Sequence, residues 1–149
     1  MSSRQSSAPS SEAIKPLFAL HRYLHASTLE PALIELVLMR ASQLNGCACS
    51  VDSRGKDGRR VCGSTQSLYV LPAWREAPFY SARERAALAW TEALTLLSHT
   101  HAPDEIYQAV KAQFTEEDQV KLTLLIVAIN GWNRIQVGFR AVPQVAEGK

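Results

Sequence analysis

Four residues between positions 35 and 54 combine a carboxylate, a thiol, a hydroxyl and a guanidinium at a spacing that suits one reaction centre. Glu35 precedes Cys47 by twelve positions, and Ser50 and Arg54 follow Cys47. If the segment after residue 46 is helical, positions 47, 50 and 54 share one helix face. A helix N-terminus stabilises a thiolate there, and a nearby carboxylate can take and return the proton. The pattern therefore indicates thiol chemistry, with Cys47 as the sulfur.

Two helices have to position these side chains. Residues 31–44 are apolar nearly all round, which is typical of a buried helix, and Glu35 is the one acid in this stretch. Asn45-Gly46 ends this helix, because Gly46 suits the left-handed conformation that often follows a helix end. The next helix is expected from Cys47 to about Arg60. Glu35 is then predicted to face Cys47 across the turn.

Helical patterns also account for the rest of the chain. Capping signals are Thr28 before Pro31, Ser81 before Glu84, and Thr115 before Asp118. Together with the apolar spacing they predict helices from residue 12 to at least 24, over 66–71, over 82–98, from 103 onward, and over 116–129. Asn130-Gly131 either interrupts a longer helix or separates two. Because no stretch alternates as a strand would, the predicted fold class is all-α.

The chain divides into a tail and one domain. Residues 1–11 hold six serines and a proline, a composition that predicts a disordered tail. Residues 12–149 are expected to form a single domain, because the chain of 149 residues is long enough to bury one core. The tail lacks the apolar stretch of a secretory signal.

Composition excludes several classes of function. The net charge of +2 is too small to indicate binding to nucleic acid or to an anionic membrane. The longest apolar run, 122–129, is far shorter than the roughly 20 residues of a membrane span. Three cysteines suit a reducing compartment, so we expect a cytoplasmic protein. The four histidines show no ligand spacing with the cysteines, and we expect no metal site and no cofactor.

Five segments spread over about residues 30–140 form a specific combination, although no single segment would be specific alone. They are Glu35-Leu-Val-Leu-Met-Arg-Ala-Ser-Gln-Leu-Asn-Gly-Cys47, Lys56-Asp57, Leu71-Pro-Ala-Trp-Arg-Glu-Ala-Pro78, Glu84-Arg-Ala-Ala-Leu-Ala89 and Ile129-Asn-Gly-Trp-Asn-Arg-Ile135. This combination resembles the alkylhydroperoxidase D-like branch of the carboxymuconolactone decarboxylase family. The resemblance implies a helical bundle whose site lies on a two-helix hairpin, and a homo-oligomer, either a trimer or a hexamer.

The resemblance also implies a chemistry. Peroxidase members of the family reduce hydroperoxides at a Glu-x11-Cys-x2-Cys-x3-His site, where the second cysteine attacks the peroxide and the first resolves the product as a disulfide. Glu35 and Cys47 match the glutamate and the first cysteine of that pattern. Ser50 stands in place of the attacking cysteine, and Arg54 stands in place of the histidine. Either this chain has lost the catalytic sulfur, or residues 49–63 carry an alteration.

These two replacements change what the site can do. A serine hydroxyl is not oxidised by peroxide, and an arginine stays protonated and cannot relay a proton, although its charge could stabilise a Cys47 thiolate. Cys49 is a poor substitute for the missing sulfur, because on a helix its side chain diverges from that of Cys47. Cys62 could resolve an oxidised Cys47, but its spacing does not require this.

Structural alternatives stay open for each residue. Glu35 could be a surface acid or the partner of an arginine, and Cys47 a small core residue. Trp132 and Asn133 suit packing and hydrogen bonding better than catalysis. Residues 122–129 suit the core or an oligomer interface.

Three functions are consistent with the sequence. The first is a hydroperoxide reductase that uses Cys47, a small hydroperoxide substrate and a thiol reductant of unknown identity. The second is an oligomeric binding or scaffold protein without catalysis, indicated by Ser50 and Arg54. The third and weakest is an enzyme like the lactone decarboxylases, for which Arg54 is poorly suited because it does not transfer protons.

Overall fold

The computed structural model describes residues 12–62 and 64–143, and these residues form helices without a β-strand. In chain order the elements are the 3₁₀ helix η2 (Glu12–Ile14), α1 (Lys15–His25), α2 (Pro31–Leu44), α3 (Ala48–Val61), α4 (Gln66–Tyr69), the 3₁₀ helix η3 (Leu71–Ala73), α5 (Ala82–Thr95), α6 (Leu97–Thr100), α7 (Asp104–Gln113) and α8 (Glu116–Gly138). The predicted all-α class is confirmed. The tail expected over residues 1–11 lies outside the described residues, and the single domain over 12–149 stays a prediction.

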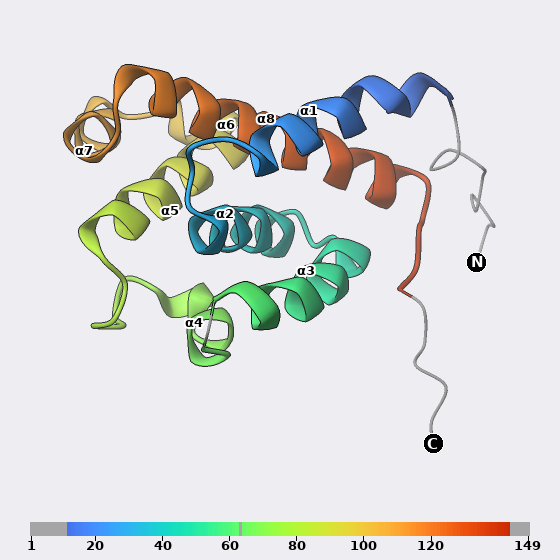
Figure 1. The fold of residues 1–149 in the computed structure, drawn as a ribbon, viewed down its shortest axis with the longest axis horizontal. Helices are drawn as coiled ribbons and strands as arrows, with labels where there is room; N and C mark the ends of the chain where they lie inside the picture. Colours follow the sequence, from blue (N-terminus) through green and yellow to red (C-terminus); the bar gives the residue numbers. More distant parts are fainter. Residues whose placement is uncertain (1–11, 63, 144–149) are drawn as a thin grey trace.

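Helix α2 lies at the centre of the molecule, with α3, α5 and α8 packed around it (Figure 1). Its side chains from Leu33 to Met39 are all buried, including Glu35. This confirms the expectation of a buried helix, which followed from the apolar residues on all of its faces. One consequence is that any polar group on α2 has to find its partners within the protein.

Helices α2 and α3 run antiparallel. The Cys62 sulfur at the end of α3 lies 3.9 Å from the carbonyl oxygen of Ala32 at the start of α2. At the other end, the Cys47 amide donates a hydrogen bond to the carbonyl oxygen of Ser42. Gly46 makes the connection with φ of 61°, the left-handed conformation that the sequence predicted.

Helix α1 crosses over α8, the longest helix of the described chain (Figure 1). The rings of Phe18 and Trp132 meet there with centroids 5.0 Å apart and a tilt of 58°. A Cβ placed on Gly131 would lie 3.9 Å from Leu17, so the two helices approach closely at this glycine. Contrary to one sequence expectation, α8 is neither broken nor interrupted at Asn130-Gly131. The Asn130 side chain instead donates to the Ile126 carbonyl oxygen and to Thr95 on α5.

Two of the three predicted caps are confirmed. Ser81 and Glu84 form a complete capping box at α5, and Thr115 accepts from the Asp118 amide at α8. The Thr28 prediction is wrong, because Glu30 occupies the N-cap of α2. The Thr28 hydroxyl donates instead to the Asp118 side chain on α8.

The helix ends differ slightly from the sequence prediction. Helix α3 begins one residue after Cys47, which is its N-cap. Helix α5 stops at Thr95, and the predicted last turn is a separate short helix, α6. No helix in the described part of the chain has the length and apolarity needed to span a membrane.

Candidate functional site

Cys47 lies buried at the N-terminus of α3, where the chain leaves α2. Its side chain is 1% exposed, and its carbonyl oxygen accepts the first hydrogen bond of α3 from Val51. The Cys47 thiol donates to the Ser50 hydroxyl oxygen at 3.1 Å. The N-terminus of a helix carries a partial positive charge. The structure therefore places the sulfur where the sequence predicted, although the helix begins one residue later.

Ser50 belongs to a hydrogen-bonded network that joins α2, α3 and α8. The Asn133 side-chain amide donates to the hydroxyl oxygens of Ser50 at 3.1 Å and of Ser42 at 3.2 Å. The Asn45 amide donates to the side-chain oxygens of Asn133 and Asn130. Each of these amides is satisfied by its neighbours, so the network fixes the Ser50 hydroxyl beside Cys47. Asn133 is confirmed as a hydrogen-bonding residue, but its bond to Ser50 was not predicted.

Glu35 makes its polar contact with Arg54. The Arg54 guanidinium lies 3.5 Å from Glu35 Oε1 and 3.6 Å from Asp57 Oδ2. Glu35 is 4% exposed, and its second oxygen, Oε2, is buried and has no hydrogen-bond partner. Burial raises the pKa of Glu35, and the positive charge of Arg54 opposes this effect only in part. Glu35 is thus a buried carboxyl group in which one oxygen faces a positive charge and the other has no polar partner.

The structure brings Glu35 to Arg54 rather than to Cys47. Between the described residues Glu35 and Cys47 there is neither a hydrogen bond nor an ion pair, contrary to the sequence expectation of a direct meeting. The reason is the antiparallel packing, in which Glu35 on α2 lies beside the second turn of α3 while Cys47 precedes the first. The alternative drawn from the sequence, that Glu35 pairs with an arginine, therefore matches the contact in the structure.

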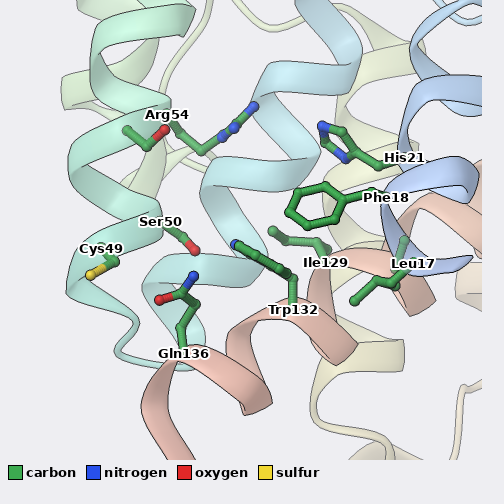
Figure 2. A pocket seen from close by; sticks show the side chains of 11 residues that line it. Leu17, Phe18, His21, Cys49, Ser50, Arg54, Ile129, Trp132 and Gln136 are labelled. Atoms are coloured by element: carbon green, nitrogen blue, oxygen red, sulfur yellow. The ribbon is translucent and has the colours of Figure 1, made fainter. Parts of the chain in front are cut away.

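A cavity of about 210 Å³ opens beside Ser50. It lies between α1, α3 and α8, and its lining includes Ser50, Arg54 and Cys49 from α3 (Figure 2). From α1 and α8 come Phe18, His21, Trp132 and Gln136, among others. Cys47 is not part of the lining. Ser50 therefore stands between the cavity and the buried sulfur.

His21 is a cavity residue that sequence reasoning missed. Figure 2 shows its imidazole on α1, on the opposite side of the cavity from α3. Burial, the neighbouring His25 and the charge of Arg54 lower the pKa of His21 to about 4. The ring is therefore neutral near pH 7 and offers one donor and one acceptor. Its sequence signal was present, because His21 follows Leu17 and Phe18 by four and three positions and so extends their face of the helix.

Cys49 lies on the outer side of the first turn of α3. Figure 2 shows its sulfur pointing away from the rings of Phe18 and Trp132. All three cysteines are free thiols. Burial raises the pKa of Cys49, and the nearby Cys47 and Asp52 raise it further. These observations agree with the expectation that Cys49 is a poor replacement for a sulfur at position 50.

Cys62 lies at the far end of α3 from Cys47. With a rise of ~1.5 Å per residue, the fifteen positions between them span roughly 20 Å. Cys62 lines a separate cavity of about 240 Å³ with Tyr80 and Glu84. Burial raises its pKa, as do the charges of Glu35 and Glu84. Cys62 therefore cannot reach Cys47 within one folded chain, and the option that it resolves an oxidised Cys47 in the same molecule is excluded by this distance.

No cluster suited to a metal ion is present in the part of the chain that the structure describes, where no three His, Cys, Asp or Glu side chains converge. The chemistry available at the cavity is that of a sulfur behind a hydroxyl, a guanidinium held by buried and half-buried acids, and a neutral imidazole. Such a set can bind an oxygen-bearing molecule by hydrogen bonds and present it to a nucleophile.

Comparison with known proteins agrees with the fold. An uncharacterized protein of Bacillus subtilis (strain 168), YdfG, is 39% identical over 126 residues, which cover 85% of this chain and 86% of that protein. A crystal structure from Agrobacterium tumefaciens, of a protein of unknown function proposed to be an antioxidant defence protein AhpD, is 42% identical with a TM-score of 0.91. The match covers 97% of this chain and all of that one.

A more distant structure shares the fold. It is an uncharacterized peroxidase-related protein from Silicibacter sp. TM1040, 21% identical with a TM-score of 0.79, and the match covers 89% of this chain and 71% of that one. The family model for carboxymuconolactone decarboxylases matches residues 12–93, which include Glu35, Cys47, Ser50 and Arg54. The chain therefore belongs to the carboxymuconolactone decarboxylase family and has the fold of the AhpD-like proteins.

Proposed function

We propose that this protein is a thiol-dependent hydroperoxide reductase in which Cys47 is the single redox sulfur. The observation that carries the proposal is the position of Cys47 at the N-terminus of α3, 3.1 Å from a hydroxyl that lines a cavity. Arg54, which lines the same cavity, supplies a positive charge beside a developing alkoxide. The description of the Agrobacterium relative as an AhpD protein supports the same class of reaction.

The reaction balances with one protein sulfur and an external thiol. The Cys47 thiolate attacks the terminal oxygen of R–O–O–H, the O–O bond breaks, and the leaving alkoxide takes a proton to become ROH. Cys47 is then a sulfenic acid. One molecule of an external thiol condenses with it to give a mixed disulfide and water. A second thiol molecule releases the Cys47 thiol and leaves as the external disulfide.

Burial limits the rate of this reaction. Cys47 is 1% exposed, so peroxide reaches the sulfur only when the Ser50 side chain or the first turn of α3 moves. No second sulfur stands at position 50 to protect the sulfenic acid as a disulfide. We therefore expect slower turnover than in relatives with two cysteines at this site.

Peroxide consumption tests this proposal directly. Wild-type protein with dithiothreitol and cumene hydroperoxide is expected to turn over, and Cys47→Ala is expected to lose the activity. Cys49→Ala and Cys62→Ala are the matched controls, which should keep it. Trapping with dimedone followed by mass spectrometry should place the adduct on Cys47. Turnover of the wild type no faster than that of Cys47→Ala would overturn the proposal.

A binding protein without catalysis is the second candidate, and one observation favours it. Ser50 closes the cavity from the Cys47 sulfur, so a ligand can occupy the cavity without meeting a thiol. This candidate predicts ligand binding that is unaffected by Cys47→Ala. Rapid reduction of alkyl hydroperoxides by pure wild-type protein would rule it out.

We also propose that the chain acts as a trimer or hexamer in the cytoplasm. The exposed valines at 120 and 127 lie on the same face of α8, where an apolar surface suits a second subunit. Free thiols at all three cysteines suit a reducing compartment. Light scattering of the full chain should give three or six times the mass of one chain. A mass equal to one chain would contradict the assembly.

A further inference from the structure

We propose that the Ser50 hydroxyl is a proton relay, which passes the proton of the Cys47 thiol to the alkoxide that leaves when the peroxide bond breaks. This inference rests on the proposed function and gives a catalytic role to one residue of the same site. It is carried by the position of the hydroxyl between the sulfur and the cavity, by its hydrogen bonds, and by the chemistry of the groups that share the cavity with it.

The Ser50 hydroxyl lies between the sulfur and the cavity. Its oxygen is 3.1 Å from the Cys47 sulfur, which is 1% exposed and is not part of the cavity lining. Ser50 itself lines the cavity, and Figure 2 shows its hydroxyl pointing from α3 toward the side formed by Trp132. In the part of the chain that the structure describes, Ser50 is therefore the side chain that both bonds to the Cys47 thiol and faces the cavity.

The hydrogen bonds of Ser50 leave its own hydrogen free for the cavity. A hydroxyl group has two acceptor positions and one donor hydrogen. The Cys47 thiol and the Asn133 amide each donate to the Ser50 oxygen at 3.1 Å, and together they occupy both acceptor positions. Among the described residues, none accepts the hydrogen of the Ser50 hydroxyl. This hydrogen is therefore available to an oxygen atom that enters the cavity.

Four other polar side chains near the cavity are less suited to the transfer. Arg54 stays protonated and does not give up a proton. The His21 imidazole lies on the opposite side of the cavity from α3, and the Cys49 sulfur points away from the rings of the wall (Figure 2). Glu35 is not part of the lining and bonds to Arg54. A relay also has to receive the proton of the thiol, and the Cys47 thiol is bonded to Ser50.

The relay completes the first step of the reaction without a free alkoxide. As the Cys47 sulfur attacks the terminal oxygen of R–O–O–H, the S–O bond forms and the O–O bond breaks. The Ser50 hydroxyl gives its proton to the leaving RO oxygen and takes the proton of the Cys47 thiol in exchange. The products are ROH and the sulfenic acid of Cys47, and the serine is regenerated. The sulfur supplies the two electrons that reduce the peroxide.

Ser50 also covers the sulfur, and the roles of cover and relay predict opposite effects of its removal. A cover alone predicts faster oxidation of Cys47 in Ser50→Ala, because the smaller side chain exposes the sulfur. A relay predicts slower oxidation, but only where the leaving group is a base strong enough to need a proton. An alkoxide is such a base, whereas a carboxylate is a weak base that leaves as the anion.

The rates at which two oxidants of similar size oxidise Cys47 separate these roles. Cumene hydroperoxide releases an alkoxide, and perbenzoic acid releases benzoate. Reduced protein is mixed with either oxidant and quenched with N-ethylmaleimide in guanidinium chloride, and mass spectrometry of the Cys47 peptide gives the unoxidised fraction. Because a positioned proton donor contributes about a hundredfold or more, we expect Ser50→Ala to react at least tenfold more slowly than wild type with cumene hydroperoxide. Its reaction with perbenzoic acid should not be slowed.

Two further variants and one measurement on wild type complete the test. Ser98→Ala, at an exposed serine of α6, is the matched control and should leave both rates unchanged. Ser50→Thr keeps a hydroxyl and should react with cumene hydroperoxide faster than Ser50→Ala does. Wild-type protein in deuterium oxide needs no variant to fold. There the reaction with cumene hydroperoxide should be slowed more than the reaction with perbenzoic acid, because only the first includes a proton transfer to the leaving group.

The outcomes distinguish this inference from the proposed function. If wild-type Cys47 is not oxidised by cumene hydroperoxide, the proposed function fails and the relay fails with it. If wild-type Cys47 is oxidised and Ser50→Ala slows both oxidants equally or slows neither, the proposed function stands and the relay is overturned. Equal effects of deuterium oxide on the two oxidants would likewise overturn the relay alone.

Discussion

Glu35 and Glu92 are both carboxyl groups on central helices that face arginine, but their surroundings are opposite. Glu92 on α5 accepts hydrogen bonds from Arg40 at 2.9 Å and from the Trp74 indole at 2.8 Å, and Arg75 lies 2.6 Å from its other oxygen. Burial alone would raise the pKa of Glu92, but these bonds outweigh it and lower the pKa. The cluster ties α2, the segment around η3 and α5 together.

Glu35 on α2 has far less support. The Arg54 guanidinium lies 3.5 Å from one carboxyl oxygen of Glu35, and the other oxygen has no hydrogen-bond partner. The pKa of Glu35 is raised, chiefly by burial. A buried carboxyl group with so few partners destabilises the fold when it is charged. Proteins keep such groups mainly at functional sites. We therefore propose that Glu92 serves the stability of the fold and that Glu35 serves the site.

The largest expected difference between the two glutamates is in the free energy of unfolding after the charge of each is removed. Glu92→Gln leaves Arg40 and Arg75 without their carboxylate and is expected to lower the free energy of unfolding by about 3 kcal/mol. Glu35→Gln removes an unbalanced buried charge and is expected to change it by less than about 1 kcal/mol. Urea unfolding followed by circular dichroism measures both. Equal losses in the two variants would break the comparison.

Restoring the family pattern tests the role of Glu35 in the site. The double variant Ser50→Cys, Arg54→His places a sulfur 3 residues after Cys47 and an imidazole beside Glu35. Since an added proton relay contributes about a hundredfold in rate, we expect peroxide turnover to rise by about that factor over wild type. The measurement is the steady-state rate with cumene hydroperoxide and dithiothreitol.

The controls for this experiment are Ser50→Cys alone and the double variant combined with Glu35→Gln. The first should gain less than the double variant, because Arg54 does not relay protons. The second should lose most of the gain. A triple variant as active as the double variant would show that Glu35 has no part in the reaction.

The dependence of stability on pH should have opposite signs for the two glutamates. Glu92 binds a proton less readily in the folded state than in the unfolded state. The stability that Glu92 contributes is therefore full above the ordinary pKa of 4.5 and is lost as pH falls through the pKa of Glu92 in the folded state. Glu35, whose pKa is raised, favours the folded state below 4.5, and this advantage is lost as pH rises through its folded pKa.

Melting temperatures of wild type, Glu92→Gln and Glu35→Gln between pH 3.5 and 8 check these signs. Glu92→Gln should reduce the loss of stability at acid pH. The melting temperature of Glu35→Gln should instead rise relative to that of the wild type as pH increases above 4.5. A Glu35→Gln curve parallel to the wild-type curve over the whole range would mean that the Glu35 carboxyl group has an ordinary pKa.

Local patterns in the sequence predicted most of the fold. The apolar residues of α2, the Gly46 turn and the caps at Ser81 and Thr115 depend on neighbours within a few positions, and all are confirmed. The Thr28 cap failed because a distant competitor exists. Asp118, 90 positions later, accepts the Thr28 hydroxyl. Residues near Thr28 contain no sign of that partner.

The site was predicted less completely, for the same reason. Spacing along α3 placed Cys47, Ser50 and Arg54 together, but the residues that complete the site come from other helices. Asn133 reaches Ser50 across 83 positions, and His21 enters the cavity from α1. Such contacts follow from how helices pack, and helix packing is not encoded in any local pattern. The offset of Glu35 from Cys47 likewise depends on the register of α2 against α3.

The smallest expected effect concerns Ser50, which belongs to a network with satisfied hydrogen bonds. Ser50→Ala removes one partner from Asn133 and one from Cys47, but Asn133 keeps Ser42 as an acceptor. We therefore expect a loss of about 1 kcal/mol in the free energy of unfolding, well below that of Glu92→Gln. Asn133→Ala removes a hydrogen-bond partner from the Ser42 and Ser50 hydroxyls and from the Asn45 amide, so it should lose more and is the matched comparison. If Ser50→Ala were as destabilising as Asn133→Ala, the hydroxyl at position 50 would be a structural centre like Glu92, and its place between Cys47 and the cavity would follow from the fold rather than from the reaction.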